Sequence, residues 1–241
     1  MGFVQSKYDP CVYTTEGGKD ALALWVDDLV LAVSDDEKLI SIKSELSSTF
    51  SAKDLGELEH FVGNKVIQSE NGISLCQEAY TKMVLDRFGF TNCKPVSSPS
   101  DVSTKLCKSD SESSPMDKRE YQAAVGCLLY LSSWSRPDIA YAVNNVAKFS
   151  SNPSQEHWVG VKRIFRYLRG TSDYGLLFRK GESDFVGFSD SDWAGDTDDT
   201  RSTSGYVFCT NGTAVSWRSK KQVSVALSTA EAEYMALANA T

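Results

Sequence analysis

Apolar and polar positions in the first 90 residues alternate with two periods, that of strands and that of helices, which predicts a small module of both. Residues 21–33 hold two apolar runs, ALALWV and LVLAV, on either side of an Asp pair, and this pattern predicts a buried β-hairpin. Residues 35–50 repeat large apolar side chains every three or four positions, as an amphipathic helix does. Residues 58–75 contain two strand-like runs that an Asn-Gly turn separates, and residues 77–88 return to helical spacing.

The pattern changes between residues 94 and 118, where Ser, Pro, Asp and Lys replace almost all large apolar residues. This composition is typical of an exposed linker, so we expect a module boundary there. Beyond it, the spacing predicts helices over residues 119–133, 138–150 and 155–169, with a proline between each pair.

Strand-like runs dominate from Tyr174 onward and predict an antiparallel sheet. Ser228 precedes Glu231 by three residues, which is the spacing of a helix capping box, and an Ala-rich helix follows. The expected strands are YGLLFRK, DFVGFSDSDW, TSGYVFCTNG, AVSWRSK and VSVAL. The whole chain therefore has the pattern of an α+β protein.

Composition places the chain among ordinary globular proteins. Its 241 residues are 41% hydrophobic and 24% charged, unlike collagen-like, mucin-like or coiled-coil sequences. Six cysteines without a CxxC pair and only two histidines argue against structural zinc and for free thiols in a reducing compartment. The N-terminus does not resemble a secretory signal, and the apolar stretch at 21–33 is too short to span a membrane. We therefore expect an intracellular protein.

One basic stretch stands out in a chain whose net charge is −7. Residues 148–180 carry seven Lys or Arg against two acids, a local charge of +5. Four of these cations share much of one face of the expected helix at 155–169: Lys162, Arg163, Arg166 and Arg169. The stretch is either a solvated helix face or a surface that binds nucleic acid, with an affinity that falls steeply with salt.

Two adjacent carboxylates, Asp27 and Asp28, lie at the tip of the apolar hairpin. They either turn the chain in water or bind a divalent cation, and the pattern leaves both readings open. In the second case the site is of the phosphoryl-transfer type, in which Mg²⁺ neutralises phosphates and activates a 3′-hydroxyl.

A second acidic cluster follows a later apolar strand. Strand periodicity puts Asp190 on the same face as Val186 and Phe188, so its carboxylate starts from a partly buried position and needs a partner or a metal. The acids farther along fit a solvated acidic loop: Asp196, Asp198 and Asp199.

The closing helix supplies the third candidate. Glu231 already has a role in the capping box, whereas Glu233 is free to meet Asp190 where the helix packs on the sheet. Spacing alone leaves this pairing a hypothesis.

Several of these strings together resemble, in order along essentially the whole chain, the Pol polyprotein of copia-type LTR retrotransposons. The most specific strings are RPDIAYAV, HWVGVKRIFRYLRGT, GFSDSDWAGDTDDTRSTSGYVF and SWRSKKQVSVALSTAEAEYMALA. WVDDLVLAVSD and LCQEAYTKMVLDRFGF match earlier parts of the same family.

The resemblance implies three segments: residues 1–92 are similar to the last palm strands and thumb of a reverse transcriptase, 93–173 to its helical connection, and 174–241 to a truncated ribonuclease H-like mixed sheet. Such a polymerase extends DNA on an RNA template and degrades the RNA of RNA–DNA hybrids with Mg²⁺ or Mn²⁺. Its partners are a hybrid or template–primer and the rest of Pol, without a membrane or small-molecule cofactor. The implied location is the cytoplasm, with the nucleus or a virus-like particle as alternatives.

The resemblance also implies site residues. The polymerase's YVDD box falls on residues 25–28, with Trp25 in place of tyrosine, which makes Asp27 the metal-binding carboxylate and Asp28 its neighbour. The first catalytic Asp of the ribonuclease H falls on Asp190 and its helical catalytic Glu on Glu233. Asp192 is the rival for the first of these roles.

Both implied metal sites look incomplete. Only 26 residues precede Asp27, and the chain stops at Thr241, so further carboxylates of each site are missing. We therefore expect the isolated chain to be inactive; the alternative is a non-catalytic retroelement remnant or domesticated fragment with at most nucleic-acid binding. A truncated ribonuclease H sheet should also expose apolar surface in residues 174–241 and favour self-association.

Overall fold

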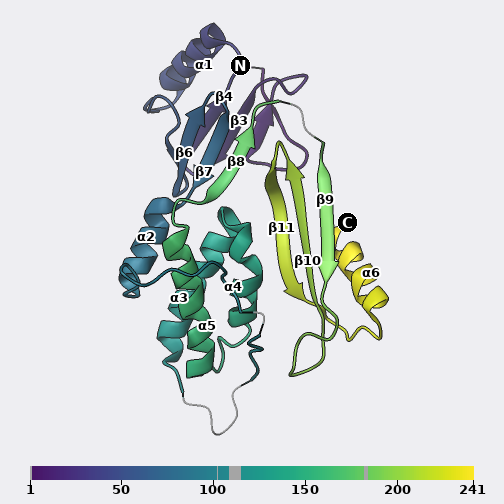
Figure 1. The fold of residues 1–241 in the computed structure, drawn as a ribbon. Coiled ribbons are helices and arrows are strands. Elements are labelled where there is room, and N and C mark those ends of the chain that lie inside the picture. The colour runs from purple at the N-terminus through teal and green to yellow at the C-terminus, as the bar shows by residue number, and fades with distance from the viewer. Residues whose placement is uncertain (1, 102, 109–114, 182–183) are drawn as a thin grey trace. The chain divides into compact units, whose positions relative to one another are not determined.

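The computed structural model describes residues 2–101, 103–108, 115–181 and 184–241, and these form two compact units (Figure 1). The units are Met1–Leu58 and Glu59–Thr241. The described residues form three antiparallel sheets, six α-helices and one 3₁₀ helix, so the α+β prediction is confirmed. The expected segments 1–92, 93–173 and 174–241 stay predictions, because compactness alone does not identify a palm, a thumb or a ribonuclease H.

The first unit contains a four-stranded sheet of order β1-β2-β3-β4 and one helix. The expected hairpin is confirmed, since β3 and β4 pair up to Trp25 and Asp28. Its expected burial is wrong, because Leu24 and Leu29 are each 39% exposed. A single helix is too small to cover a four-stranded sheet. The elements are β1 (Val4–Gln5), β2 (Val12–Thr14), β3 (Ala21–Trp25), β4 (Asp28–Ala32) and α1 (Asp36–Thr49).

A buried carboxylate ties this sheet to the start of α1. Asp20 Oδ1 accepts hydrogen bonds from the backbone N (2.8 Å) and hydroxyl (2.9 Å) of Ser34, and Oδ2 forms an ion pair with Lys38. The Lys38 ammonium and the two Ser34 donors hold the pKa of Asp20 well below its ordinary value. The expected helix begins as predicted, because the Asp35 side chain caps it by accepting from Lys38 N.

The second unit opens with a four-stranded sheet, order β5-β6-β7-β8, whose last strand comes from about 100 residues farther along the chain. The hairpin at the Asn-Gly turn is confirmed. The assignment of YGLLFRK to the C-terminal sheet is wrong, because that strand pairs with β7. The lack of a side chain at Gly175 allows this close pairing, because a Cβ there would lie only 2.1 Å from the Leu75 carbonyl oxygen. The strands are β5 (His60–Phe61), β6 (Asn64–Ser69), β7 (Gly72–Cys76) and β8 (Gly175–Arg179).

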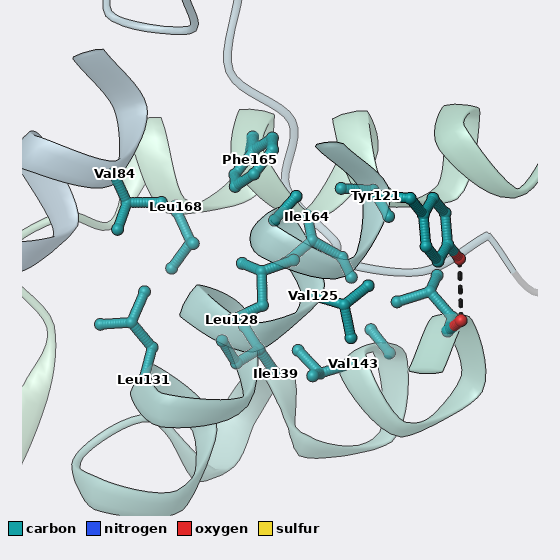
Figure 2. Close-up of a cluster of buried hydrophobic side chains, with 14 of the residues drawn as sticks. Val84, Tyr121, Val125, Leu128, Leu131, Ile139, Val143, Ile164, Phe165 and Leu168 are labelled. Atoms are coloured by element: carbon teal, nitrogen blue, oxygen red, sulfur yellow. Dashed lines mark hydrogen bonds between the residues drawn. The ribbon is translucent and has the colours of Figure 1, made fainter. Parts of the chain in front are cut away.

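The main hydrophobic core lies among the helices, and all of the expected helices are present. Figure 2 shows side chains of α2, α3, η1, α4 and α5 meeting in one cluster, in which Leu128, Phe165 and Leu168 are fully buried. Phe165 stacks on Phe88 at 5.2 Å between ring centroids. The helices are α2 (Glu78–Arg87), α3 (Lys118–Trp134), η1 (Pro137–Ile139), α4 (Ala140–Ala147) and α5 (Gln155–Gly170).

Tyr121 links α3 to α4, and the contribution of its hydroxyl to the stability of the protein can be tested. It is fully buried and donates to the Val146 carbonyl at 2.8 Å (Figure 2). Burial also raises the pKa of Tyr121, so the hydroxyl stays protonated. We expect Tyr121→Phe to lower the free energy of unfolding by about 1–2 kcal/mol in urea titrations, because the ring stays and only the hydrogen bond is lost. An unchanged midpoint would contradict this role.

The segment expected as an exposed linker packs against α5 in part. His157 Nε2 lies 2.7 Å from the Cys107 carbonyl, and a Cβ on Gly170 would lie 3.0 Å from Pro95 Cβ. His157 Nδ1 accepts from Ser154 N (3.0 Å), so Nε2 carries the proton that the carbonyl accepts. Composition predicted the lack of regular structure here, but not these contacts. Residues 109–114 of the segment lie outside the described residues.

The last sheet has the order β11-β10-β9 and carries α6 on one face (Figure 1). Ala232 and Ala236 are buried in this packing. Ser228 caps α6 as expected, but the Glu231 carboxylate accepts from Leu227 N (2.7 Å). The expected strand VSVAL is wrong, because this segment bends around the sheet end. The elements are β9 (Val186–Ser191), β10 (Thr203–Thr210), β11 (Thr213–Lys221) and α6 (Thr229–Ala240).

The expected exposure of apolar surface after residue 174 is confirmed. Phe188 on β9 and Tyr234 on α6 are 60% and 74% exposed. Leu227, in the segment of chain that joins β11 to α6, is 84% exposed. The expected self-association stays a prediction.

Candidate active site

The hairpin carboxylates lie on a tight, strained turn. Val26 and Asp27 form the turn, and Asp28 is the first residue of β4. Val26 has φ 57°, in the left-handed region where a β-branched residue is strained and where such turns favour Gly or Asn. Asp27 and Asp28 are both exposed. Two carboxylates therefore lie at adjacent positions of this turn. Turn formation alone does not explain its sequence, because Val is unfavourable at the position of Val26.

The second pair of candidate residues comes from two elements that pack together, β9 and α6, but no described contact joins Asp190 to Glu233. Ser191, the residue after Asp190, donates its backbone N–H to Glu233 Oε1 at 3.4 Å. The predicted packing of this helix on this strand is thus present. The predicted partial burial of Asp190 is wrong: Asp190 is exposed, and so are Val186 and Phe188 on the same face of β9, at 41% and 60%.

The two rival carboxylates of this strand have different surroundings. Asp192 Oδ1 accepts from Thr203 N at 2.5 Å, and Asp192 N donates to the Thr203 carbonyl at 3.2 Å. A Cβ on Gly195 would lie 2.1 Å from Asp192 Oδ2, so only glycine leaves room for this carboxylate. The Asp190 carboxylate makes no hydrogen bond or ion pair with any described residue. Asp192 therefore has a structural role at the end of the β9–β10 pair, and Asp190 is the freer carboxylate.

The loop after Asp192 is only in part the solvated acidic loop that the sequence suggested, since Asp198 is exposed but Asp196 is buried. Asp196 is 9% exposed and forms ion pairs with Lys221 (2.9 Å) and Lys148 (3.2 Å). Burial by itself would raise its pKa, but the hydrogen bonds from Lys221, Asp198 N and Lys148 outweigh burial and lower the pKa of Asp196 to about 2. Lys221 also bridges to Asp199 at 2.8 Å.

Sequence reasoning missed this ionic cluster, although a signal was present. In the strand SWRSKKQ, Lys221 alternates with Trp217 and Ser219, so it lies on the face of β11 opposite Arg218 and Lys220. That face packs against the helices, since Trp217 Nε1 donates to the Ser132 carbonyl at 2.7 Å. A lysine on a packed face requires a carboxylate partner.

Three arginines of the basic stripe on α5 contact an earlier segment of the same chain, residues 91–101. Lys162, Arg163 and Arg166 are partly buried, and Arg169 is exposed. Guanidinium groups are strong donors to carbonyl and carboxylate oxygens. The contacts are Arg163 Nη1 to Asp101 Oδ2 (3.2 Å), Arg166 Nε to the Lys94 carbonyl (2.9 Å) and Arg169 Nε to the Thr91 carbonyl (2.6 Å). The stripe thus has a structural use, and its binding of nucleic acid stays a prediction.

The part of the chain that the structure describes contains neither a ready-made metal cluster nor a membrane-spanning helix. No group of three or more His, Cys, Asp or Glu side chains could hold a metal ion there. No described helix is both long and apolar enough to cross a membrane.

Known proteins match this chain along its length. A family model described as Reverse transcriptase (RNA-dependent DNA polymerase) matches residues 1–102. The retrovirus-related Pol polyprotein from transposon TNT 1-94 of Nicotiana tabacum is 41% identical, over 97% of this chain and 18% of its own length. The corresponding polyprotein from transposon RE2 of Arabidopsis thaliana is 38% identical, over 99% of this chain and 16% of its own length.

A third relative is closer in length to this chain. The putative transposon Ty5-1 protein YCL074W of Saccharomyces cerevisiae is 31% identical, over 98% of this chain and 78% of its own length. No solved structure gives a significant match. The chain spans about a sixth of the length of the tobacco and Arabidopsis polyproteins. It belongs to the family of Pol polyproteins of copia-type retrotransposons and is related to their reverse transcriptases.

Proposed function

We propose that this chain is the part of a retrotransposon Pol polyprotein that joins the end of an RNA-directed DNA polymerase to the start of a ribonuclease H. In the first role the parent protein extends DNA on an RNA template, with Asp27 as a metal ligand and Asp28 as its neighbour. In the second role it degrades the RNA strand of RNA–DNA hybrids, with Asp190 and Glu233 as metal ligands.

The observation that carries this proposal is the packing of α6 on β9, which brings Glu233 to the backbone of the residue after Asp190. The Glu233 carboxylate accepts from Ser191 N, which fixes one of its oxygens near the turn out of β9. Asp190 is the preceding residue, and its carboxylate has no hydrogen bond or ion pair with the residues described. Strand alternation places its side chain on the face of β9 opposite that of Ser191. Asp192, bound by Thr203 N, is a weaker candidate for a ligand because a metal would have to displace that hydrogen bond.

The donor set fits a hard divalent cation. Mg²⁺ is commonly held by one or two carboxylates, with water and substrate phosphates completing its coordination, and two carboxylate groups meet this requirement. When bound, the metal supplies charge neutralisation for the phosphate and a more acidic water. The chain's own contribution is to hold the carboxylates on rigid elements, with Glu233 oriented by Ser191 N.

The strained turn supports the polymerase assignment. Backbone strain is retained where a particular side-chain placement is needed, and Val26 is strained directly before Asp27. Trp25 replaces the tyrosine of the family's box and pairs across the hairpin with Asp28. Any further metal ligands for this site would come from other parts of the Pol polyprotein.

Metal binding tests the ribonuclease H assignment directly. We expect Mn²⁺, followed by electron paramagnetic resonance with an RNA–DNA hybrid present, to bind roughly tenfold more weakly to Asp190→Asn and to Glu233→Gln than to the parent chain. Glu231→Gln is the matched control, since it lies on the same helix and its amide oxygen can still accept from Leu227 N. Equal Mn²⁺ affinity in all four proteins would exclude Asp190 and Glu233 as ligands.

Cleavage of the RNA strand in the same hybrid distinguishes the two hypotheses about function, a part of a ribonuclease H and a non-catalytic remnant. We expect the isolated chain to leave the hybrid uncut. Cutting that disappears in Asp190→Asn and Glu233→Gln would mean that the chain completes the site by itself. Binding of the hybrid without Mn²⁺ affinity at these two residues would favour the alternative, a non-catalytic remnant that binds nucleic acid.

A further inference from the structure

Strand β9 forms one edge of its sheet, and backbone groups on its outer side are open for pairing (Figure 1). Successive residues of an antiparallel strand point their N–H and C=O groups alternately to one side and the other. Asp192 N donates to the Thr203 carbonyl, so the even-numbered residues of β9 bond to β10, and Gly187, Ser189 and Ser191 point outward. No described residue bonds the outward groups of Gly187 or Ser189.

One outward group of β9 is already bound, and this limits how another strand can pair. Ser191 N donates to Glu233 Oε1 at 3.4 Å, so α6 covers that end of the edge. Among the described contacts, only Gly187 and Ser189 remain available on this side, with one N–H and one C=O each. Lys and Pro, which commonly protect edge strands from pairing, do not occur in β9. The open part of the edge is therefore short and has Phe188 at its centre.

Apolar side chains flank this edge on both faces of the sheet. Phe188 is 60% exposed on one face, and Val186 beside it is 41% exposed. On the other face, α6 packs over β9 and β10. Leu237 follows Glu233 by one helical turn, so it lies on the side of α6 near the open edge, and it is 53% exposed. Exposed apolar side chains beside unpaired backbone groups are typical of an association surface.

We propose that this edge binds β9 of a second copy of the chain, paired antiparallel about a twofold axis at Phe188. In this register, Gly187 lies opposite Ser189 of the second copy, and Ser189 lies opposite its Gly187. Each of these pairs exchanges both of its N–H and C=O groups, as hydrogen-bonded pairs of an antiparallel ladder do. The contact between Ser191 and Glu233 stays intact. A second β9 therefore supplies matching groups without displacing any described contact.

The side chains are compatible with this register. Phe188 lies opposite Phe188 of the second copy, an aromatic pair of the kind that stabilises antiparallel strands. Asp190 lies opposite Val186 of the second copy, so no two carboxylates of β9 face each other. On the other face, strands lie about 4.8 Å apart, which places the two α6 helices, each over β9 and β10, roughly 10 Å apart. Packed helices have axes about 8–10 Å apart, so Leu237 of each copy reaches the other helix.

This dimer goes beyond the proposed function and does not depend on it, because neither a metal nor nucleic acid takes part. Each copy carries a net charge of −7, so electrostatic repulsion opposes association and added salt should strengthen it. Binding of nucleic acid has the opposite salt dependence. Experiments in EDTA without nucleic acid therefore test the dimer alone, whatever the outcome for the metal site.

Sedimentation velocity of the full chain measures the dimer directly. We expect the parent to shift from monomer to dimer as its concentration rises. Ser189→Pro removes an outward N–H without removing a bond to β10, so it should raise the Kd of the dimer by roughly tenfold or more. Ser189→Thr keeps this N–H and is the matched control, with the parent's Kd. Equal Kd values in these two variants would overturn the proposal. A parent that stays monomeric at about 200 μM would also do so, and would leave the edge to a strand from another part of the Pol polyprotein.

A second variant leaves the backbone of β9 unchanged. Leu237→Lys places a charge between the two α6 helices and should also raise the Kd of the dimer by roughly tenfold. Met83→Lys is the matched control, since Met83 lies on α2 and is 51% exposed. Thermal midpoints verify that each variant is folded. Equal Kd values for Leu237→Lys and Met83→Lys would contradict the predicted contact between the two helices.

Oxidative cross-linking tests the register. Phe188→Cys places two thiols on the axis, where the Cα atoms of a non-hydrogen-bonded pair are about 4.5 Å apart, within the range of a disulfide. Val186→Cys is the control, because its two copies would lie about 13 Å apart. The parent, with its six native cysteines, gives the background. We expect a disulfide-linked dimer above this background only from Phe188→Cys, and equal yields from all three proteins would contradict the register.

Discussion

Arg136→Ala should lower the free energy of unfolding by about 3–5 kcal/mol, because it removes a buried cation and leaves its partners unpaired. Arg136 is 1% exposed, and its guanidinium donates to both carboxylate oxygens of Asp138 (2.8–3.3 Å), to the Thr171 carbonyl (2.8 Å) and to Thr171 Oγ1 (2.7 Å). The rings of Tyr167 and Tyr174 each lie 5.7 Å from its central carbon.

Two further variants make the Arg136 prediction specific. Arg136→Lys keeps the charge but cannot form the paired contacts with Asp138, so we expect a loss of intermediate size. Arg119→Ala removes an exposed arginine at the start of α3 and should change stability by less than about 0.5 kcal/mol. Urea unfolding followed by tryptophan fluorescence measures all three. A loss below about 1 kcal/mol for Arg136→Ala would show that the network does not stabilise the helices.

The Arg136 network also gives a physical reason for one of the most specific strings in the sequence. In RPDIAYAV, Pro137 begins η1, Asp138 orients the guanidinium, and Arg136 joins the end of α3 to the end of α5. The resemblance depends on this string, and its first three residues have a structural role. A string can therefore be diagnostic of a family without marking its active site.

Acid should destabilise the second unit through Asp196. Its pKa is lowered from 3.8 to about 2, so between these values the unfolded chain binds a proton that the folded chain does not. The stabilisation is therefore complete above about pH 4 and is lost as the pH falls toward 2. A shift of this size corresponds to about 2 kcal/mol. Urea unfolding between pH 2 and pH 7 should show this loss in the parent and a smaller slope in Asp196→Asn.

Lys221→Met tests the same cluster at neutral pH. It removes the cation that contacts both Asp196 and Asp199 and leaves a buried carboxylate with Lys148 as its remaining ion-pair partner. We expect a loss of about 3 kcal/mol at pH 7. Asp173→Asn, at an exposed site, is the control and should keep the parent's stability and pH dependence. An unchanged pH profile in Asp196→Asn would mean that other carboxylates account for the acid sensitivity.

Most of the local structure of this chain could be predicted from its sequence. The hairpins at Asp27 and at Asn71 and the helices with their capping residues all follow from patterns within about 20 residues. The family assignment likewise follows from strings of residues. These features are local, because turn preferences, side-chain alternation and helix caps depend on near neighbours.

Contacts between distant segments were decided only by the tertiary structure. Strand β8 pairs with β7 across about 100 residues, and periodicity cannot name a partner strand. Burial of Asp196 depends on Lys148 and Lys221, which lie 48 and 25 residues away. The same limit applies to Arg166 and Arg169 of α5, whose carbonyl partners lie 72 and 78 residues earlier in the chain.

The candidate site combines both kinds of information. The sequence by itself determined which carboxylates to consider and that Asp190 and Asp192 were rivals, because both fit one spacing. The tertiary structure separated them: Thr203 N donates to the Asp192 carboxylate and Gly195 packs against it, whereas the Asp190 carboxylate has no hydrogen bond or ion pair with the described residues. The sequence specifies which side chains can carry charge, but each carboxylate's hydrogen-bond partners exist only after the chain has folded.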